Sequence, residues 1–204
     1  MEGIINAGSG VTIGMHVDKN EQAHVFSTTR TINEQATSLG NSYNINSGSI
    51  ALTSSSDSGV FYFKNDEFPV NGESSFIIDA IAIGIDNAGT TTKNSTITVV
   101  RNPSTGTLIS GASAVAMNQN RNFGSPNTLN STSYAYKGVE GSTITNGNDI
   151  AIFFQSAGSR GYYTVDFELT KGSSIGVKLN TYTSSGTTNA YIAIIGHRKD
   201  GNNE

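Results

Sequence analysis

The stretch from Ser74 to Asp86, which reads SSFIIDAIAIGID, constrains the fold more than any other part of the chain. It is the longest apolar run, and Asp79 is the only charge in its interior. Its many isoleucines, with a glycine near the end and turn residues on both sides, favour a strand over a central helix. In an extended strand one face would carry Phe76, Ile78, Ala80, Ala82 and Gly84, and the other Ile77, Asp79, Ile81, Ile83 and Ile85. Because both faces are apolar, we expect both to be covered, either within the fold or by a neighbouring subunit.

Short apolar or alternating segments, separated by turn residues, recur along the rest of the chain. We expect further strands at 49–53, 60–64, 95–101, 133–137, 149–155, 161–170, 174–179 and 189–197. In the segment 161–170 the large apolar side chains alternate with Asp166 and Glu168, which we expect to point outward. No repeat of fixed period is visible, which argues against a propeller or a β-helix. The expected fold class is all-β: an antiparallel two-sheet sandwich of jelly-roll type.

The first forty residues have a different character. Residues 1–19 are rich in glycine with scattered apolar residues, which indicates an extended N-terminal arm or an edge strand, and 23–30 alternates weakly. Thr31 and Glu34 have the spacing of a capping box, and Gly40 is placed to end a short helix. Ile32, Ala36 and Leu39 would share one face of it. We therefore expect an arm with a short helix in 1–40, the β-sandwich in 41–200 and a polar tail in 201–204.

Composition excludes several classes of function. Charged residues make up only 14% of the chain and the net charge is −4, with no Lys/Arg cluster to neutralise phosphates, so we expect no binding to nucleic acid. The absence of cysteine excludes disulfides and thiol nucleophiles. No apolar segment approaches the length of a membrane span, and the first residues lack the basic and apolar regions of a signal peptide, so we expect a protein made in a cytoplasm that does not enter a membrane.

No motif indicates catalysis. The three histidines, His16, His24 and His197, lie far apart without metal-ligand spacing, although His16 and His24 could approach each other across a hairpin. Gly8-Ser9-Gly10 lacks the strand-to-helix context and the Lys-Ser/Thr of a phosphate loop. We find no nucleophile elbow. We therefore expect neither enzymatic activity nor a metal or other cofactor.

Two spots have the residue types of interface anchors. The polar stretch 117–127 contains Asn118, Arg121 and Phe123 among five asparagines and glutamines, and a second spot combines Arg160 with Tyr162 and Tyr163. Arginine and aromatic side chains in polar surroundings are enriched at protein interfaces. The alternative for the first spot is a solvated loop whose phenylalanine packs back onto the core.

Six segments, taken together and in order, resemble a family of virion structural proteins of tailed bacteriophages. They are 41–53 (NSYNINSGSIALT), 60–66 (VFYFKND), 99–107 (VVRNPSTGT), 118–125 (NQNRNFGS), 171–178 (KGSSIGVK) and 193–200 (AIIGHRKD). No single segment is diagnostic, and the resemblance extends from about residue 17 onward. It implies a particle component present in many copies, and it carries over no catalytic or ligand residues.

Several expectations follow from that resemblance. The chain would be a non-enzymatic virion protein, as a capsid decoration or cement protein that stabilises the head, or as a tail or baseplate protein. Its partners would be other copies of itself, most simply as a homotrimer, and the major capsid protein or other virion proteins. From another class, a glycan-binding module could use Tyr134, Tyr162 and Tyr182. A hydrolase with an unrecognised carboxylate pair is a further alternative.

Overall fold

The computed structural model describes residues 2–6, 11–17, 23–29, 31–66, 75–104, 119–129 and 134–199, the first three ranges as backbone only. Strands dominate, with one short helix near the start. The long elements from the helix onward are α1 (Ile32–Ser38), β4 (Ser42–Leu52), β5 (Ser58–Lys64), β6 (Ser75–Ile85), β8 (Ser95–Arg101), β10 (Asn148–Gln155), β11 (Arg160–Leu169), β12 (Ser174–Asn180) and β14 (Thr188–Lys199). Three shorter strands are β7 (Thr90–Thr91), β9 (Tyr134–Lys137) and β13 (Thr183–Ser185). The expected polar tail, 201–204, lies outside the described residues.

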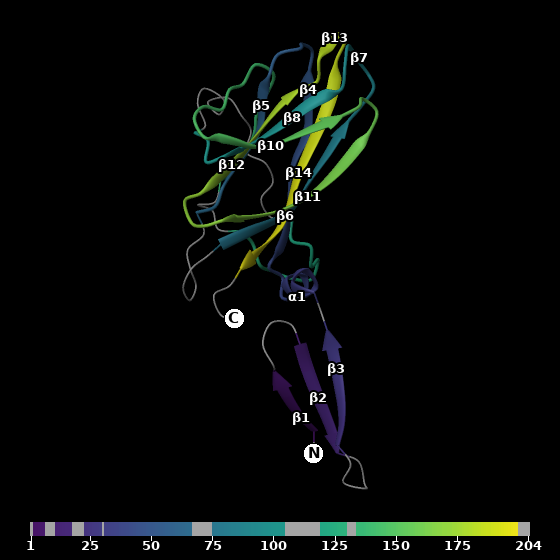
Figure 1. Ribbon diagram of the computed structural model, residues 1–204, viewed down its shortest axis with the longest axis vertical. Coiled ribbons are helices and arrows are strands. Elements are labelled where there is room, and N and C mark those ends of the chain that lie inside the picture. Colours follow the sequence, from purple (N-terminus) through teal and green to yellow (C-terminus); the bar gives the residue numbers. More distant parts are fainter. Residues whose placement is uncertain are drawn as a thin grey trace.

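Two antiparallel sheets form the body of the molecule (Figure 1). One has the strand order β11-β6-β14-β4 and the other the order β10-β8-β12-β5-β9. We call them the four-stranded and the five-stranded sheet. The two sheets pack face to face, so the all-β sandwich expected from the sequence is confirmed. β7 and β13 form a separate two-stranded ribbon.

The N-terminal segment is folded into a sheet of its own. β1 (Glu2–Asn6), β2 (Val11–Val17) and β3 (Ala23–Thr29) pair antiparallel in the order β1-β2-β3, so the expected arm is a three-stranded meander (Figure 1). In the register of β2 and β3, His16 lies directly opposite His24. The predicted approach of these two histidines across a hairpin is therefore confirmed at the level of the backbone.

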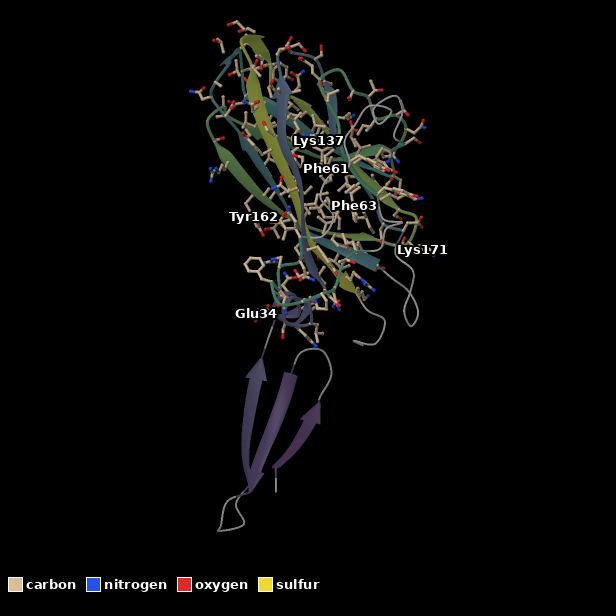
Figure 2. The ribbon with its side chains drawn as sticks, turned by 180° about the vertical axis from the view of Figure 1, so that it is seen from behind. Glu34, Phe61, Phe63, Lys137, Tyr162 and Lys171 are labelled. Atoms are coloured by element: carbon tan, nitrogen blue, oxygen red, sulfur yellow. The ribbon has the colours of Figure 1, made fainter. Side chains whose placement is uncertain are left out.

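Aromatic and branched aliphatic side chains fill the space between the two sheets. Phe61 and Phe63 of β5 project into this interior (Figure 2), and both are fully buried. The ring of Phe63 meets Phe76 of β6 edge-on, with 5.1 Å between the ring centroids. Burial of an aromatic or large aliphatic side chain contributes about 1.5–3 kcal/mol, so this layer is the main source of stability.

β6 is the central strand that the sequence predicted, but its side chains are distributed differently. Phe76, Ile78, Ile81, Ile83 and Ile85 are all buried. In a strand with strict alternation, the three isoleucines beyond Asp79 would lie on the other face of β6 from Phe76 and Ile78. A β-bulge is the reason: in the pairing with β14, Ala80 lies opposite Ile195 and Ile78 opposite Gly196, which leaves Asp79 as an extra residue. One extra residue reverses the side-chain phase, so every large apolar side chain beyond it turns to the core.

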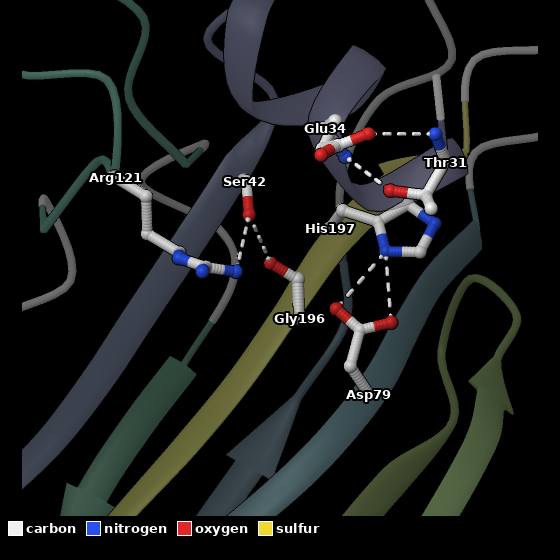
Figure 3. Close-up of polar contacts among 7 residues, drawn as sticks. All are labelled: Thr31, Glu34, Ser42, Asp79, Arg121, Gly196 and His197. Atoms are coloured by element: carbon white, nitrogen blue, oxygen red, sulfur yellow. Dashed lines mark hydrogen bonds and ion pairs between the residues drawn. The ribbon is translucent and has the colours of Figure 1, made fainter. Parts of the chain in front are cut away.

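The helix begins as predicted. The Thr31 side chain accepts a hydrogen bond from the Glu34 amide, and the Glu34 carboxylate accepts one from the Thr31 amide, which completes the capping box (Figure 3). Gly40 follows the helix with a φ of +72°, a conformation that glycine adopts without strain. Of the predicted apolar face only Ala36 is buried, whereas Ile32 and Leu39 are 66% and 52% exposed.

Candidate protein-interaction face

The predicted loop is attached to the end of α1 by its asparagines. The side-chain amide of Asn120 donates to the Gly40 carbonyl at 2.6 Å. Those of Asn122 and Asn127 donate to the carbonyls of Ser38 and Leu39 at 3.1 and 3.2 Å. The last carbonyls of a helix have no partner inside it, so these amides satisfy groups that would otherwise face solvent. The asparagine-rich composition therefore fixes the loop to the helix end.

Arg121 and Phe123 lie in this fixed loop, whereas Asn118 lies outside the described residues. The Arg121 amide donates to the Ser42 carbonyl at 2.9 Å, and its guanidinium Nη1 lies 3.4 Å from the Ser42 hydroxyl (Figure 3). The Phe123 side chain is fully exposed, at 101%. The alternative, in which Phe123 packs back onto the core, is therefore wrong. An aromatic side chain held in solvent by an ordered loop is a feature of interface anchors.

The second predicted spot lies on the outer face of the four-stranded sheet. In one row across this sheet, Tyr162 of β11 pairs with Ala82 of β6, Ala82 with Ala193 of β14, and Ala193 with Asn46 of β4. The adjacent row pairs Arg160 with Gly84 and Gly84 with Tyr191. Tyr162 and Tyr191 are 64% and 45% exposed, and Figure 2 shows Tyr162 on the flank of the molecule.

Small residues make the centre of this face flat. Ala82, Gly84 and Ala193 form the floor of a shallow groove of about 330 Å³, which Arg160, Tyr191 and Asn46 border. A hollow of about 620 Å³ lies between Asn44 and the loop residues 119–123 and 125. Asn44 and Asn46 are two positions apart on β4 and pair with Ile195 and Ala193 of the same neighbouring strand. Both predicted spots therefore border one face, which we call the alanine face.

A histidine–aspartate pair lies on the same sheet, beneath α1. His197 Nδ1 is 3.1 Å from Asp79 Oδ1, and the side chains are 8% and 14% exposed (Figure 3). With its amide nitrogen turned to the pair, Asn33 of α1 lies 3.1 Å from Asp79 Oδ2. The pair therefore connects the helix to β6 and β14. The sequence alone does not predict this pair, although the isolated charge of Asp79 inside an apolar run is a signal.

The tyrosines proposed for a glycan site do not share one surface. Tyr162 lies on the alanine face, whereas Tyr134 belongs to β9 at the edge of the five-stranded sheet, stacked on Tyr136 with 5.9 Å between ring centroids. The ring of Tyr182 is covered by the Lys93 ammonium at 3.8 Å, and its hydroxyl lies 3.1 Å from the Thr96 hydroxyl. A single sugar-binding platform made of these three residues is therefore not formed.

Within the described residues, no group of three or more histidines or carboxylates could hold a metal ion. The described part of the chain likewise contains no helix long and apolar enough to cross a membrane. The described residues form an all-β sandwich whose four-stranded sheet has a flat outer face lined by small residues. No protein-family model matches the chain, and no curated protein matches it.

Proposed function

We propose that this chain is a non-enzymatic structural component of a bacteriophage particle, and within the particle a capsid decoration protein that stabilises the head. The observation that carries the proposal is the alanine face, a flat sheet surface bordered by Arg160, Tyr162 and Tyr191. The small side chains at its centre allow a second protein surface to approach the sheet closely, and the large side chains at its margin supply contact area.

The order of the strands supports a jelly roll. Counting only the eight long strands in chain order, β4, β5, β6 and β8 alternate between the four-stranded and the five-stranded sheet, and so do β10, β11, β12 and β14. Such alternation is typical of jelly rolls, which occur in viral capsid proteins among others. The likeness of fold is an analogy and adds to the resemblance of the six sequence segments, which points to phage virions.

In this role the protein would act mechanically. The alanine face would lie against the major capsid protein, with Phe123 and Tyr162 as anchors that lose their exposure on docking. Burial of apolar area at many equivalent sites would oppose the separation of neighbouring capsomers. The low charge of the chain suits such contacts, because few ionic groups must lose water when the surfaces meet.

Mass spectrometry of purified particles, with heads and tails separated, tests this role. We expect the chain in many copies in the head fraction. Its presence in the tail fraction alone would replace decoration by a tail or baseplate role, and its absence from both fractions would contradict the proposal.

A binding experiment then tests the face itself. Ala193→Arg places a long charged side chain in the centre of the alanine face, and we expect it to abolish co-sedimentation with expanded capsids. Ser185→Arg, at an exposed position of β13, is the matched control and should bind as the unchanged protein does. Equal binding of both variants would show that the alanine face is not the docking surface.

A further inference from the structure

A row of exposed apolar side chains follows β10, on the sheet opposite to the alanine face. Ile150, Ile152 and Phe154 are 42%, 53% and 68% exposed, while the alternate residues Ala151 and Phe153 pack against the core. No charged residue lies between Ile150 and Gln155. Contiguous exposed apolar side chains of this kind mark surfaces that bind another molecule.

The neighbouring part of the same sheet face is covered by the chain itself. The segment 138–147 crosses it, since the Gly59 amide donates to the Ser142 carbonyl and Ser104 exchanges two backbone hydrogen bonds with Thr145. A side chain at Gly176 of β12 would collide with Ile144 of this segment. The cover thus reaches β5 and β12 but leaves the row on β10 exposed.

β10 is also an edge strand, and the other three edges of the sandwich carry features that oppose pairing. β11 has a bulge between Thr164 and Phe167. β4 has one at Ser47 and Gly48, opposite Ile192. β9 has only four residues, and its Lys137 Nζ donates to the Ser49 carbonyl of β4 at 3.3 Å. Bulges, short strands and lysines are the usual means by which proteins keep edges from pairing.

β10 lacks such features over most of its length. Its own bulge lies at the start, between Asp149 and Ala151, and the five residues from Ala151 to Gln155 pair with β8 in unbroken register. This segment contains no proline, glycine or charge. Within the described residues, β8 is the only strand paired with it, so its other side offers a regular set of backbone donors and acceptors.

We propose that β10 pairs antiparallel with β10 of a second copy of this chain, about a two-fold axis at Ile152. The two five-stranded sheets then join into one continuous sheet. In this register Ile152 faces Ile152 of the second copy, and Ala151 faces Phe153 of the second copy on both sides of the axis. Ile150, at the bulge, lies beside Phe154 of the second copy. Ile150 and Phe154 flank Ile152 on its two sides and all three are exposed, so a two-fold axis at Ile152 brings all six side chains into one apolar cluster.

Charges do not oppose this pairing. Asp149, just before the bulge, would lie near the uncharged Gln155 of the second copy, and its carboxylate already pairs with Lys178 of its own chain at 2.8 Å. No like charges therefore meet directly across the strands. Because the row is complementary to itself, the partner that it fits is a second copy of the chain. A two-fold contact gives a dimer, in contrast to the homotrimer that the sequence suggested.

Single cysteines test the register, because the chain contains none of its own. We expect Ile152→Cys to form a covalent dimer on mild oxidation, since residues directly opposite in an antiparallel pair have Cα atoms about 4.5–5.5 Å apart, which is within the span of a disulfide. Phe154→Cys should not, because it would lie about 14 Å from Phe154 of the second copy, four residues along the strand. Phe123→Cys, fully exposed and remote from β10, measures random collision. A yield at Ile152 no higher than at Phe123 would overturn the proposal.

Light scattering over a range of concentrations tests the assembly without a cross-link. The unchanged protein should have the mass of a dimer, and Ile152→Lys should raise the dissociation constant at least tenfold. Phe123→Ser, which removes an exposed aromatic elsewhere, should leave the dimer intact, and circular dichroism should show that both variants are folded. A monomer at all concentrations, a trimer, or a dimer unaffected by Ile152→Lys would each contradict pairing through β10.

Discussion

β10 and β11 are consecutive strands joined by the short turn 156–159, which passes from one sheet to the other, and each forms an edge of its own sheet, yet their edges differ. β11 is interrupted near its centre, where Asp166 has a φ of +53° and is exposed together with Glu168. β10 is uncharged from Ile150 to Gln155, and its outward side chains are apolar. The edge of β11 is protected against pairing with a further strand, whereas the edge of β10 is suited to accept one. Protection of an edge against pairing with a further strand is therefore a property of each strand in this fold.

Substitutions on the inward and outward faces of β10 should differ most in their effect on the free energy of unfolding. Phe153 stacks on Tyr163 of β11, with 4.1 Å between ring centroids, whereas Phe154 is 68% exposed. We expect Phe153→Ala to lower the free energy of unfolding by about 3 kcal/mol, because it leaves a cavity between the sheets. Phe154→Ala should change it by no more than about 0.5 kcal/mol in the monomer.

Chemical unfolding at low protein concentration measures both values, since dimerisation would add apparent stability at high concentration. Comparable losses for the two variants would show that the outward residue is packed, and that β10 does not present the row described above.

The connection between these two edge strands depends on Gln155. Its side-chain nitrogen donates to the carbonyls of Ile83 and Ser159 at 3.1 and 2.8 Å, and its side-chain oxygen accepts from the Tyr163 hydroxyl at 3.2 Å. We expect Gln155→Leu to cost about 2 kcal/mol, because buried polar groups lose their partners. Calorimetry of the variant measures this loss. Gln155→Glu, which retains the shape and loses the donor, is the matched comparison, and an unchanged melting temperature for both would contradict this role.

The bulge in β11 can be tested at Asp166. We expect Asp166→Val to destabilise the fold by about 1 kcal/mol, because a β-branched residue is strained at a positive φ. Asp166→Gly adopts the same backbone without strain and should be at least as stable as the unchanged protein. Urea unfolding separates the two variants. A Val variant as stable as the Gly variant would mean that the bulge does not hold this conformation in solution.

The stability that Glu140 contributes to the fold should depend weakly on pH. Hydrogen bonds from the side chains of Ser54 and Thr53 hold the pKa of Glu140 below its ordinary value of 4.5, against a smaller opposing effect of burial. A lowered pKa in the folded state stabilises the protein above the unfolded pKa, and this contribution disappears as pH falls through the folded pKa.

We expect this contribution to be about 0.5 kcal/mol, since the site is near the surface. Unfolding curves of the unchanged protein and of Glu140→Gln should therefore differ near pH 7 and converge at acidic pH. A constant difference at every pH would contradict the assignment.

The sequence predicted the long strands that alternate or are strongly apolar, because burial of one face leaves a pattern in the chain. It missed the first half of β4, where serines and asparagines dominate and Gly48 forms a bulge. It also assigned the faces of β6 incorrectly beyond Asp79, since a single extra residue has no signature in composition.

The candidate sites were predictable only in part. Residue type indicated Phe123 and Tyr162, both of which are exposed. The row on β10 could not be identified as an edge, because strand order depends on contacts between distant segments. The His197–Asp79 pair was missed for the same reason, since the two residues meet only through the pairing of β14 with β6.

Hydrogen exchange at several protein concentrations tests most directly whether β10 and β11 differ as edges. We expect amides within residues 151–155 to become more protected as concentration rises, while those of β11 around Asp166 exchange at a constant rate. Exchange from β10 and β11 that is equally independent of concentration would contradict this expectation.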